Sequence, residues 1–403
     1  MKVALLRARR LIDGRARFFA IIPFVLRQKQ IRDTVLAIGL AYAVMALPDA
    51  LGALSAKLGL GGVSSSLFFL WFAALPVPIG ALCVRFGAAR LVRASLLLAV
   101  VACVALATGA LFTGVACCGF ALAGLANVVL QVAAPVWVSE QEPVCRVAGL
   151  LTGGLFVKTL MAVAFPFAVA AAAGVGCWPL ALLPFAALAG LGVCRMTRTA
   201  RPPQPVAGVR RSAERALGHV VRDPAAVVAA AAFAVAIVAD VLFCLSIPEL
   251  VARRFGRGDA TAAVAYAVLF GVKLPVTLLG AWHFARRPAH RTFAPVLLVA
   301  LAGAVGMAAT DGLFPFLVGV ALFAAGFANV YGQVFDAVAR RHPQTMPAVA
   351  SLLTMAVSAG AVASPLGAWT KTIGGRAPEV AVLALVALLV PLAAFVTFSR
   401  NKA

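Results

Sequence analysis

Long apolar stretches of the chain alternate with short polar segments that carry most of its charged residues. Twelve apolar stretches come close to the ~20 residues that a helix needs to cross a bilayer. They lie at 34–56, 63–84, 94–112, 115–138, 147–170, 179–194, 226–248, 262–284, 293–310, 314–338, 347–368 and 379–398. This pattern predicts an all-α polytopic membrane protein with 12 transmembrane helices.

The composition of the chain supports this interpretation. Of the 403 residues, 63% are hydrophobic and 12% are charged, whereas a soluble domain is roughly half apolar and a quarter charged. The net charge of +22 would by itself suggest nucleic acid, but the basic residues form short clusters between apolar stretches. A nucleic-acid-binding protein gathers them on one polar face. The composition therefore argues against a soluble enzyme, a nucleic-acid-binding protein and a disordered tail.

The basic residues also predict the orientation of the chain. Of the 35 Lys and Arg residues, 27 lie at the two ends of the chain and in the loops after the even-numbered spans, and 6 lie in the other loops. The side richer in Lys and Arg is normally cytoplasmic, so we expect an inner-membrane protein with both termini in the cytoplasm. The expected units are a basic N-terminal segment (1–33), a six-helix bundle (34–194), a basic linker (195–225), a second six-helix bundle (226–398) and a short tail (399–403).

The two halves of the chain repeat each other. At an offset of 202 residues, 123–132 lies over 325–334 with seven of ten positions identical, and 147–152 lies over 349–354 with five of six identical. The matched polar residues are Asn127 with Asn329 and Gln131 with Gln333. Two parallel six-helix repeats joined by a basic cytoplasmic linker are typical of major facilitator transporters.

Motifs in five of the spans carry a family resemblance. They are Phe69-Leu-Trp-Phe72, Pro78-Ile-Gly80 and Arg85-Phe-Gly87 in and after the second span, Leu130-Gln-Val-Ala133 in the fourth, Val238-Ala-Asp-Val241 and Ile247-Pro248 in the seventh, Gly326 to Asn329 in the tenth and Ser358-Ala-Gly360 in the eleventh. With these motifs the chain resembles the fucose/galactose/glucose–proton symporter branch of the major facilitator superfamily over spans 1 to 11. The resemblance implies a major facilitator fold with two pseudo-symmetric halves.

The resemblance also implies a function, secondary active transport with proton-coupled import of a sugar or related small polar solute by alternating access. The chain departs from the branch at Gln131, where fucose-type members carry a carboxylate, and in the fifth span, where 147–154 is largely apolar. This sparse polar lining leaves two alternatives open. One is a proton-coupled exporter of a hydrophobic or cationic compound, and the other is a non-transporting membrane sensor.

Four ionisable residues lie well inside predicted spans, where charges are costly and indicate a functional site. They are Asp49, Lys158, Asp240 and Lys273. We expect Asp49 and Asp240, each ~24 Å along its helix, to couple transport to protons. Lys158 and Lys273 are expected to be their charge partners or gating residues. The alternatives are permanent ion pairs that only hold helices together, and lysines that bind an anionic substrate.

Polar side chains of the repeat are the candidate substrate ligands. Asn127 and Gln131 are four residues apart, as are Asn329 and Gln333, so each pair shares one helix face. Together with Tyr331, they are expected to exchange hydrogen bonds with a polar solute. The alternative is interhelical hydrogen bonding that holds the bundle together.

The sequence carries no signature of an enzyme, a metal centre or a cofactor site. The four histidines lack metal-ligand spacing, the eight cysteines form no CxxC pair, and the glycine-rich pieces lack the context of a phosphate loop. We therefore expect a transporter that needs no cofactor or metal and works as a monomer in a lipid bilayer. Its expected partners are protons and a sugar-like solute, and not nucleic acid.

Overall fold

The computed structural model describes residues 29–47, 70–109, 112–142, 144–174, 177–199, 212–256 and 259–399. Within these ranges every regular element is a helix. Ten helices are long and apolar enough to cross a membrane, and two shorter apolar helices lie at 35–44 and 76–86. They occupy the twelve predicted places along the chain, which confirms the expected all-helical membrane architecture.

The first half of the chain folds as one group of packed helices. They are α2 (Lys29–Val44), α5 (Pro76–Phe86), α6 (Ala88–Thr108), α7 (Thr113–Gln141), α8 (Val144–Gly174), the short η1 (Trp178–Leu182) and α9 (Leu183–Thr199). Gly87 has a φ of 85°, a conformation that suits glycine, and it turns the chain between α5 and α6. α6 packs on α7, and α2 packs against α8 and α9.

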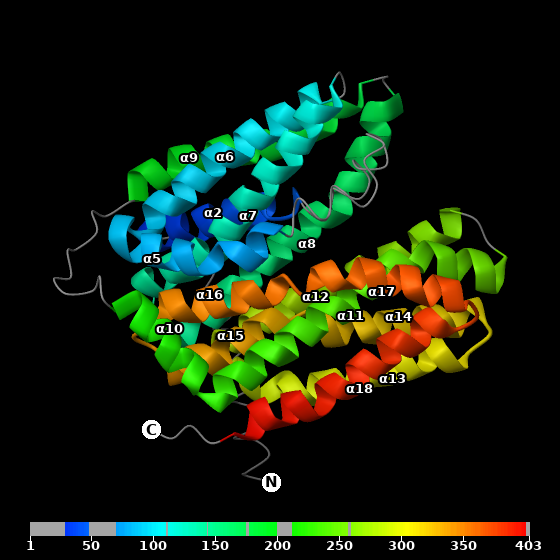
Figure 1. Ribbon diagram of the computed structural model, residues 1–403. Helices are drawn as coiled ribbons and strands as arrows, with labels where there is room; N and C mark the ends of the chain where they lie inside the picture. The colour runs from blue at the N-terminus through cyan, green and yellow to red at the C-terminus, as the bar shows by residue number, and fades with distance from the viewer. Residues whose placement is uncertain are drawn as a thin grey trace, which may run out of the picture.

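The second half folds as a similar group. Its members are α11 (Pro224–Phe255), α12 (Asp259–Phe284), η3 (Ala289–Thr292), α13 (Phe293–Ala309), α14 (Leu313–Phe327), α15 (Val330–Arg341), α16 (Met346–Val357), α17 (Gly360–Ile373) and α18 (Ala377–Phe398). In Figure 1 the two groups lie one above the other, close together at the left and diverging toward the right.

The two repeats differ in the continuity of their helices. α7 and α8 are uninterrupted, whereas the equivalent helices of the second half break between α14 and α15 and between α16 and α17. Gly332 stands where the first half has Leu130, and Gly360 stands where it has Lys158. Gly332 lies within α15 after the first break, and Gly360 is the first residue of α17 after the second.

The linker contains more structure than its Arg- and Pro-rich sequence predicts. α9 continues to Thr199, and 212–222 forms α10 (Ser212–Arg222). α10 buries Val220, leaves His219 and Arg222 exposed, and packs against α5 of the first half and α11 and α16 of the second. This part of the basic linker is therefore a packed helix, because the apolar face of α10 is covered by both halves.

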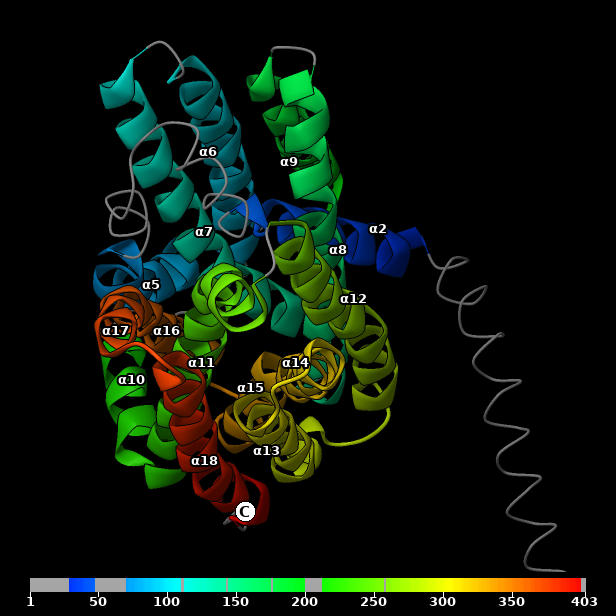
Figure 2. The same ribbon diagram turned by 90° about the vertical axis from the view of Figure 1, so that its right-hand side faces the viewer.

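The two halves meet at the end of the molecule where the turns are rich in arginine, which we call the basic end. The arginines at these turns are Arg85, Arg90, Arg93, Arg286, Arg287, Arg291, Arg340 and Arg341. Here α16 packs on α5 and α7, and α8 packs on α12 and α15; Figure 2 shows α8 beside α12. The Ser351 hydroxyl of α16 donates across the interface to Pro76 O, at 2.7 Å.

Glycines allow the helices to approach closely at the basic end. A Cβ on Gly80 would lie 3.1 Å from Pro347 O, and a Cβ on Gly149 would lie 2.9 Å from the main-chain nitrogen of Ala285. Gly332 similarly faces Thr152 of the other half. Since these contacts join α5 to α16, α8 to α12 and α15 to α8, the basic end is closed by backbone-level packing between the halves.

Glycines also set the α13–α14 contact, and this yields a stability prediction. Gly303→Ala should lower the stability by about 1–3 kcal/mol, because its Cβ would lie 2.5 Å from the main-chain nitrogen of Phe323. Gly306→Ala is the matched control, since its Cβ would lie 3.9 Å from Gly319. Thermal unfolding in detergent measures both. Equal melting temperatures for the two variants would refute the tight contact.

Candidate transport site

Asp240 of α11 and Lys273 of α12 form an ion pair deep within their helices. Lys273 Nζ lies 2.7 Å from Asp240 Oδ1 and 3.0 Å from Oδ2. Asp240 is ~24 Å from the start of α11 at 1.5 Å per residue, as expected from the sequence. Its side chain is 30% exposed and that of Lys273 is 10% exposed. The carboxylate is therefore the more accessible partner of the pair.

An aromatic stripe on α12 supports the lysine. One face of α12 carries, at helical spacing, the side chains of Tyr266, Phe270 and Lys273. Lys273 Nζ lies 5.5 Å from the centre of the Phe270 ring. The Tyr266 ring stacks on the Phe270 ring with 6.4 Å between their centres. The Tyr266 hydroxyl donates to Cys244 O of α11 at 2.5 Å. These aromatic residues were not predicted as part of the site, although their i, i+4, i+7 spacing with Lys273 was a usable signal.

The predicted pair of the first half is only partly visible. Asp49 lies outside the described residues, so the distance between Asp49 and Lys158 is not defined. Lys158 is half-buried on α8, and α8 packs against α2, the first predicted span. α8 therefore neighbours the helix that precedes Asp49 in the chain.

The amides of α7 share one face, as their spacing predicts. Gln131 Nε2 donates to Asn127 Oδ1 at 3.2 Å, and Asn127 Nδ2 donates to Met45 O at 3.3 Å. Asn127 is 4% exposed, whereas Gln131 is half-buried. Asn127 thus joins α7 to the segment that follows α2, and Gln131 is the more accessible of the two.

The equivalent amides of the second half are tied into its own helices. Asn329 Nδ2 donates to Val276 O at 3.1 Å, and the side chain packs against Gly280 of α12. Gln333 Nε2 donates to Thr292 Oγ1 at 2.9 Å, and the residue is 1% exposed. These contacts match the interhelical alternative to ligand binding.

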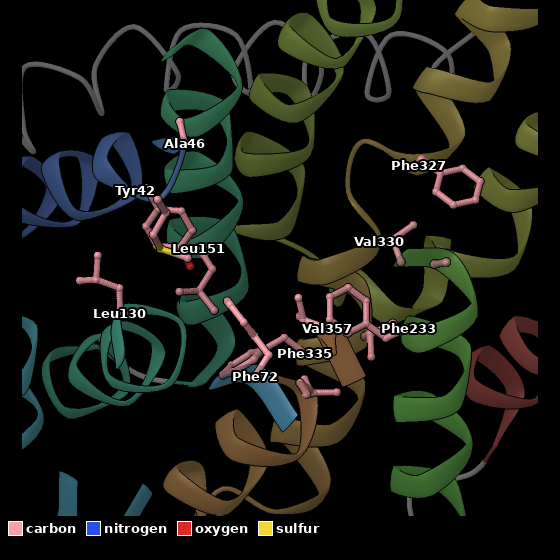
Figure 3. Packing of buried hydrophobic residues seen from close by; sticks show 14 of the residues in the cluster. Tyr42, Ala46, Phe72, Leu130, Leu151, Phe233, Phe327, Val330, Phe335 and Val357 are labelled. Carbon is pink, nitrogen blue, oxygen red and sulfur yellow. The ribbon is translucent and has the colours of Figure 1, made fainter. Parts of the chain in front are cut away.

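Tyr331 lies at the contact between the halves. Its ring centre is 5.5 Å from that of Phe233 and 5.9 Å from that of Phe335, and its hydroxyl interacts with that of Tyr42 on α2. Tyr42 is 1% exposed and packs on Gly154 of α8. Figure 3 shows Tyr42 with Phe335 in this packed region.

Residues 34–365 match the model of the Major Facilitator Superfamily. The chain belongs to the major facilitator superfamily. It is a membrane transporter and not an enzyme. A search among curated proteins finds no significant match.

Solved structures with the same fold include sugar–proton symporters. The E. coli fucose:proton symporter FucP superposes with a TM-score of 0.79 at 15% identity, covering 92% of this chain and 99% of that chain. FucP in the outward conformation gives a TM-score of 0.77 at 15% identity, over 90% and 98% of the two chains. The proton:xylose symporter XylE gives 0.66 at 14% identity, over 93% and 95%. At these identities the likeness concerns the fold.

Other ionisable clusters brace the second half of this transporter. Asp336, 1% exposed, accepts hydrogen bonds from His290 Nδ1 at 2.8 Å and Arg340 Nε at 2.6 Å. At the opposite end, Arg254 of α11 pairs with Glu379 of α18 at 3.1 Å. Among the described residues, no group of three or more His, Cys, Asp or Glu side chains is arranged to hold a metal ion.

The different surroundings of the two glutamines give a prediction. Gln333→Leu should leave the solute KM within about twofold, because the Gln333 amide donates to Thr292 and not to the solute. The loss of that hydrogen bond should cost only about 1 kcal/mol of folding stability. Gln131→Leu, the matched change in the other half, should raise KM by about tenfold if its amide binds solute. Uptake kinetics in proteoliposomes measure both. A larger KM effect at Gln333 would reverse their assignment.

Proposed function

We propose that this transporter imports a small polar, sugar-like solute together with protons, by alternating access. The observation that carries the proposal is the Asp240–Lys273 pair, a partly exposed carboxylate held against an ammonium group far from both ends of α11. A permanent structural pair gains nothing from an accessible carboxylate. A coupling site requires one, because the proton must reach it.

The proposed roles follow from these surroundings. A proton that binds Asp240 removes the charge that holds Lys273, and so changes the contact between α11 and α12. Gln131 and Tyr331 are the proposed solute ligands, because each is only half-buried. Asn127, Asn329 and Gln333 are proposed to hold the helices that carry them. Asp49 with Lys158 is proposed as the corresponding pair of the first half.

Alternating access would use the packing between the halves. With the basic end closed by glycine contacts, the solute reaches its site from the opposite end; opening the basic end then releases solute and proton. The Lys and Arg distribution favours a cytoplasmic position for the basic end, and we propose import through an inner membrane with cytoplasmic termini. We further propose a monomer, since each chain contains both halves.

Uptake by purified protein in proteoliposomes tests this function. A panel of fucose, galactose, glucose, N-acetylhexosamines and sugar acids is offered with and without an inwardly directed proton gradient. We expect at least one solute to accumulate only when the gradient is present. If no panel member is taken up and none moves protons, the proposal fails.

A further inference from the structure

We propose that the transported solute is an organic anion, a hydroxylated carboxylate such as a sugar acid, that enters together with the proton as a neutral pair. This inference rests on the proposed function and specifies its substrate class. The site that carries it is the Asp240–Lys273 pair with the aromatic stripe of α12.

The net charge of the site favours a solute that carries a negative charge. The two acids and two bases that lie well inside the spans sum to zero. When H⁺ binds an oxygen of Asp240, the site gains one positive charge, whatever the other groups nearby. An added charge at this depth of a membrane is costly. A solute carboxylate that enters with the proton restores neutrality, whereas a neutral sugar does not.

The second step is the geometry of the lysine. Both oxygens of one carboxylate lie within 3.0 Å of Lys273 Nζ, so the ammonium already holds a carboxylate in a two-oxygen arrangement. Lys273 is 10% exposed and lies beside the Phe270 ring, whereas the Asp240 side chain is 30% exposed. The solute can therefore approach from the side of Asp240 and take over its contact once Asp240 is neutral.

The third step concerns the polar groups around the pair. The Tyr266 hydroxyl is committed to Cys244 O, one turn further along α11 from Asp240. Tyr331 packs on Phe233, about two turns from Asp240 toward the basic end. The hydroxyl of Tyr331 contacts Tyr42 and the amide of Gln131 donates to Asn127, and both half-buried side chains can exchange these partners for solute hydroxyl groups. The arrangement thus offers a charged group for a carboxylate and neutral polar groups for the hydroxylated remainder.

The proton and solute balance gives a distinctive electrical signature. One H⁺ and one carboxylate enter together and are released together, so no net charge crosses the membrane. Co-transport of a proton with a neutral sugar instead carries one positive charge inward and accelerates under an inside-negative potential. The substrate class and the potential dependence are therefore two independent readouts of one proposal.

Uptake of matched solutes in proteoliposomes tests the inference. Galacturonate is compared with galactose, and glucuronate with glucose, under an inward proton gradient and under a potassium diffusion potential imposed with valinomycin. We expect uptake of a sugar acid to exceed that of its neutral partner by about tenfold or more, since a charged hydrogen bond of this kind corresponds to such a factor. The imposed potential alone should leave the rate unchanged.

Two outcomes overturn the inference in different ways. If a neutral sugar accumulates with protons and the sugar acids do not, the substrate class is wrong but the proposed function stands. If neither class responds to the proton gradient, both proposals fail.

Variants separate a binding lysine from a merely structural one. Lys273→Gln should abolish the preference for the acid over the neutral sugar, whereas Asp240→Asn should retain exchange of the acid without dependence on the proton gradient. Lys371→Gln, at an exposed position in the last turn of α17, is the control and should keep wild-type uptake. An unchanged acid preference in folded Lys273→Gln protein would contradict the proposal.

Discussion

Replacing Lys273 with Met should destabilise the protein by about 3 kcal/mol and abolish proton-driven uptake. Removing one member of a buried ion pair typically costs 3–5 kcal/mol because the other charge is left without compensation, and the 30% exposure of Asp240 places the cost at the lower end. Thermal unfolding in detergent measures the stability, and uptake by folded protein in proteoliposomes measures the function.

The double variant Asp240→Asn/Lys273→Met distinguishes structure from coupling. With both charges removed, the stability should return to within about 1 kcal/mol of the wild type, since an apolar or neutral replacement of a whole pair is often tolerated. Proton-driven uptake should remain absent. If the double variant recovers both stability and coupled uptake, the pair only holds α11 against α12.

Replacing Gly149 with Ala should shift the transporter away from the conformation closed at the basic end. The new Cβ would lie 2.9 Å from the Ala285 main-chain nitrogen and 3.1 Å from Ala281 O, and backbone atoms cannot rotate away. Overpacking of this kind costs about 1–3 kcal/mol, which corresponds to a shift of about 5- to 150-fold in the equilibrium. Distances between spin labels on α8 and α12 at the basic end report the populations.

Gly153→Ala provides the matched control on the same helix. Gly153 lies about one turn from Gly149, and its Cβ would stay 3.9 Å from the Ala281 side chain. Both variants gain the same helix propensity from alanine, so a difference between them isolates the contact with α12. Identical label distances in the two variants would show that close packing at Gly149 does not hold the basic end closed.

The arrangement of spans was predictable from the sequence because hydropathy alone specifies which segments enter the membrane. The repeat of 123–132 in 325–334 likewise predicted two related halves, and the family match at 34–365 bears out the superfamily. The positions at which individual helices break were harder to predict. The break between α14 and α15 falls in the segment that repeats α7 most closely, so the matched residues did not predict it. The helical structure of α10 depends on its packing against both halves of the protein, and these packing surfaces exist only in the folded protein.

The candidate site was predictable in its residue types but not in its partners. Helical spacing places Asn329 and Gln333 one turn apart, yet it does not say that their amides turn to Val276 and Thr292 of their own half. The Asp240–Lys273 contact was one of the open alternatives, because two opposite charges in adjacent spans have few other ways to lower their cost in a membrane. The Tyr42–Tyr331 contact joins residues nearly 300 positions apart, and no local pattern indicates it.

Simultaneous recording of solute and proton movement in wild-type and Asp240→Asn proteoliposomes tests the proposed coupling most directly. Vesicles that contain a pH-sensitive dye are supplied with a solute that the wild-type protein accumulates. Entry of solute should acidify the interior of wild-type vesicles, with about one proton per solute molecule if charge is to balance. Asp240→Asn vesicles should exchange labelled solute without any acidification. Solute-driven acidification at the wild-type rate in Asp240→Asn vesicles would contradict a coupling role for the Asp240–Lys273 pair.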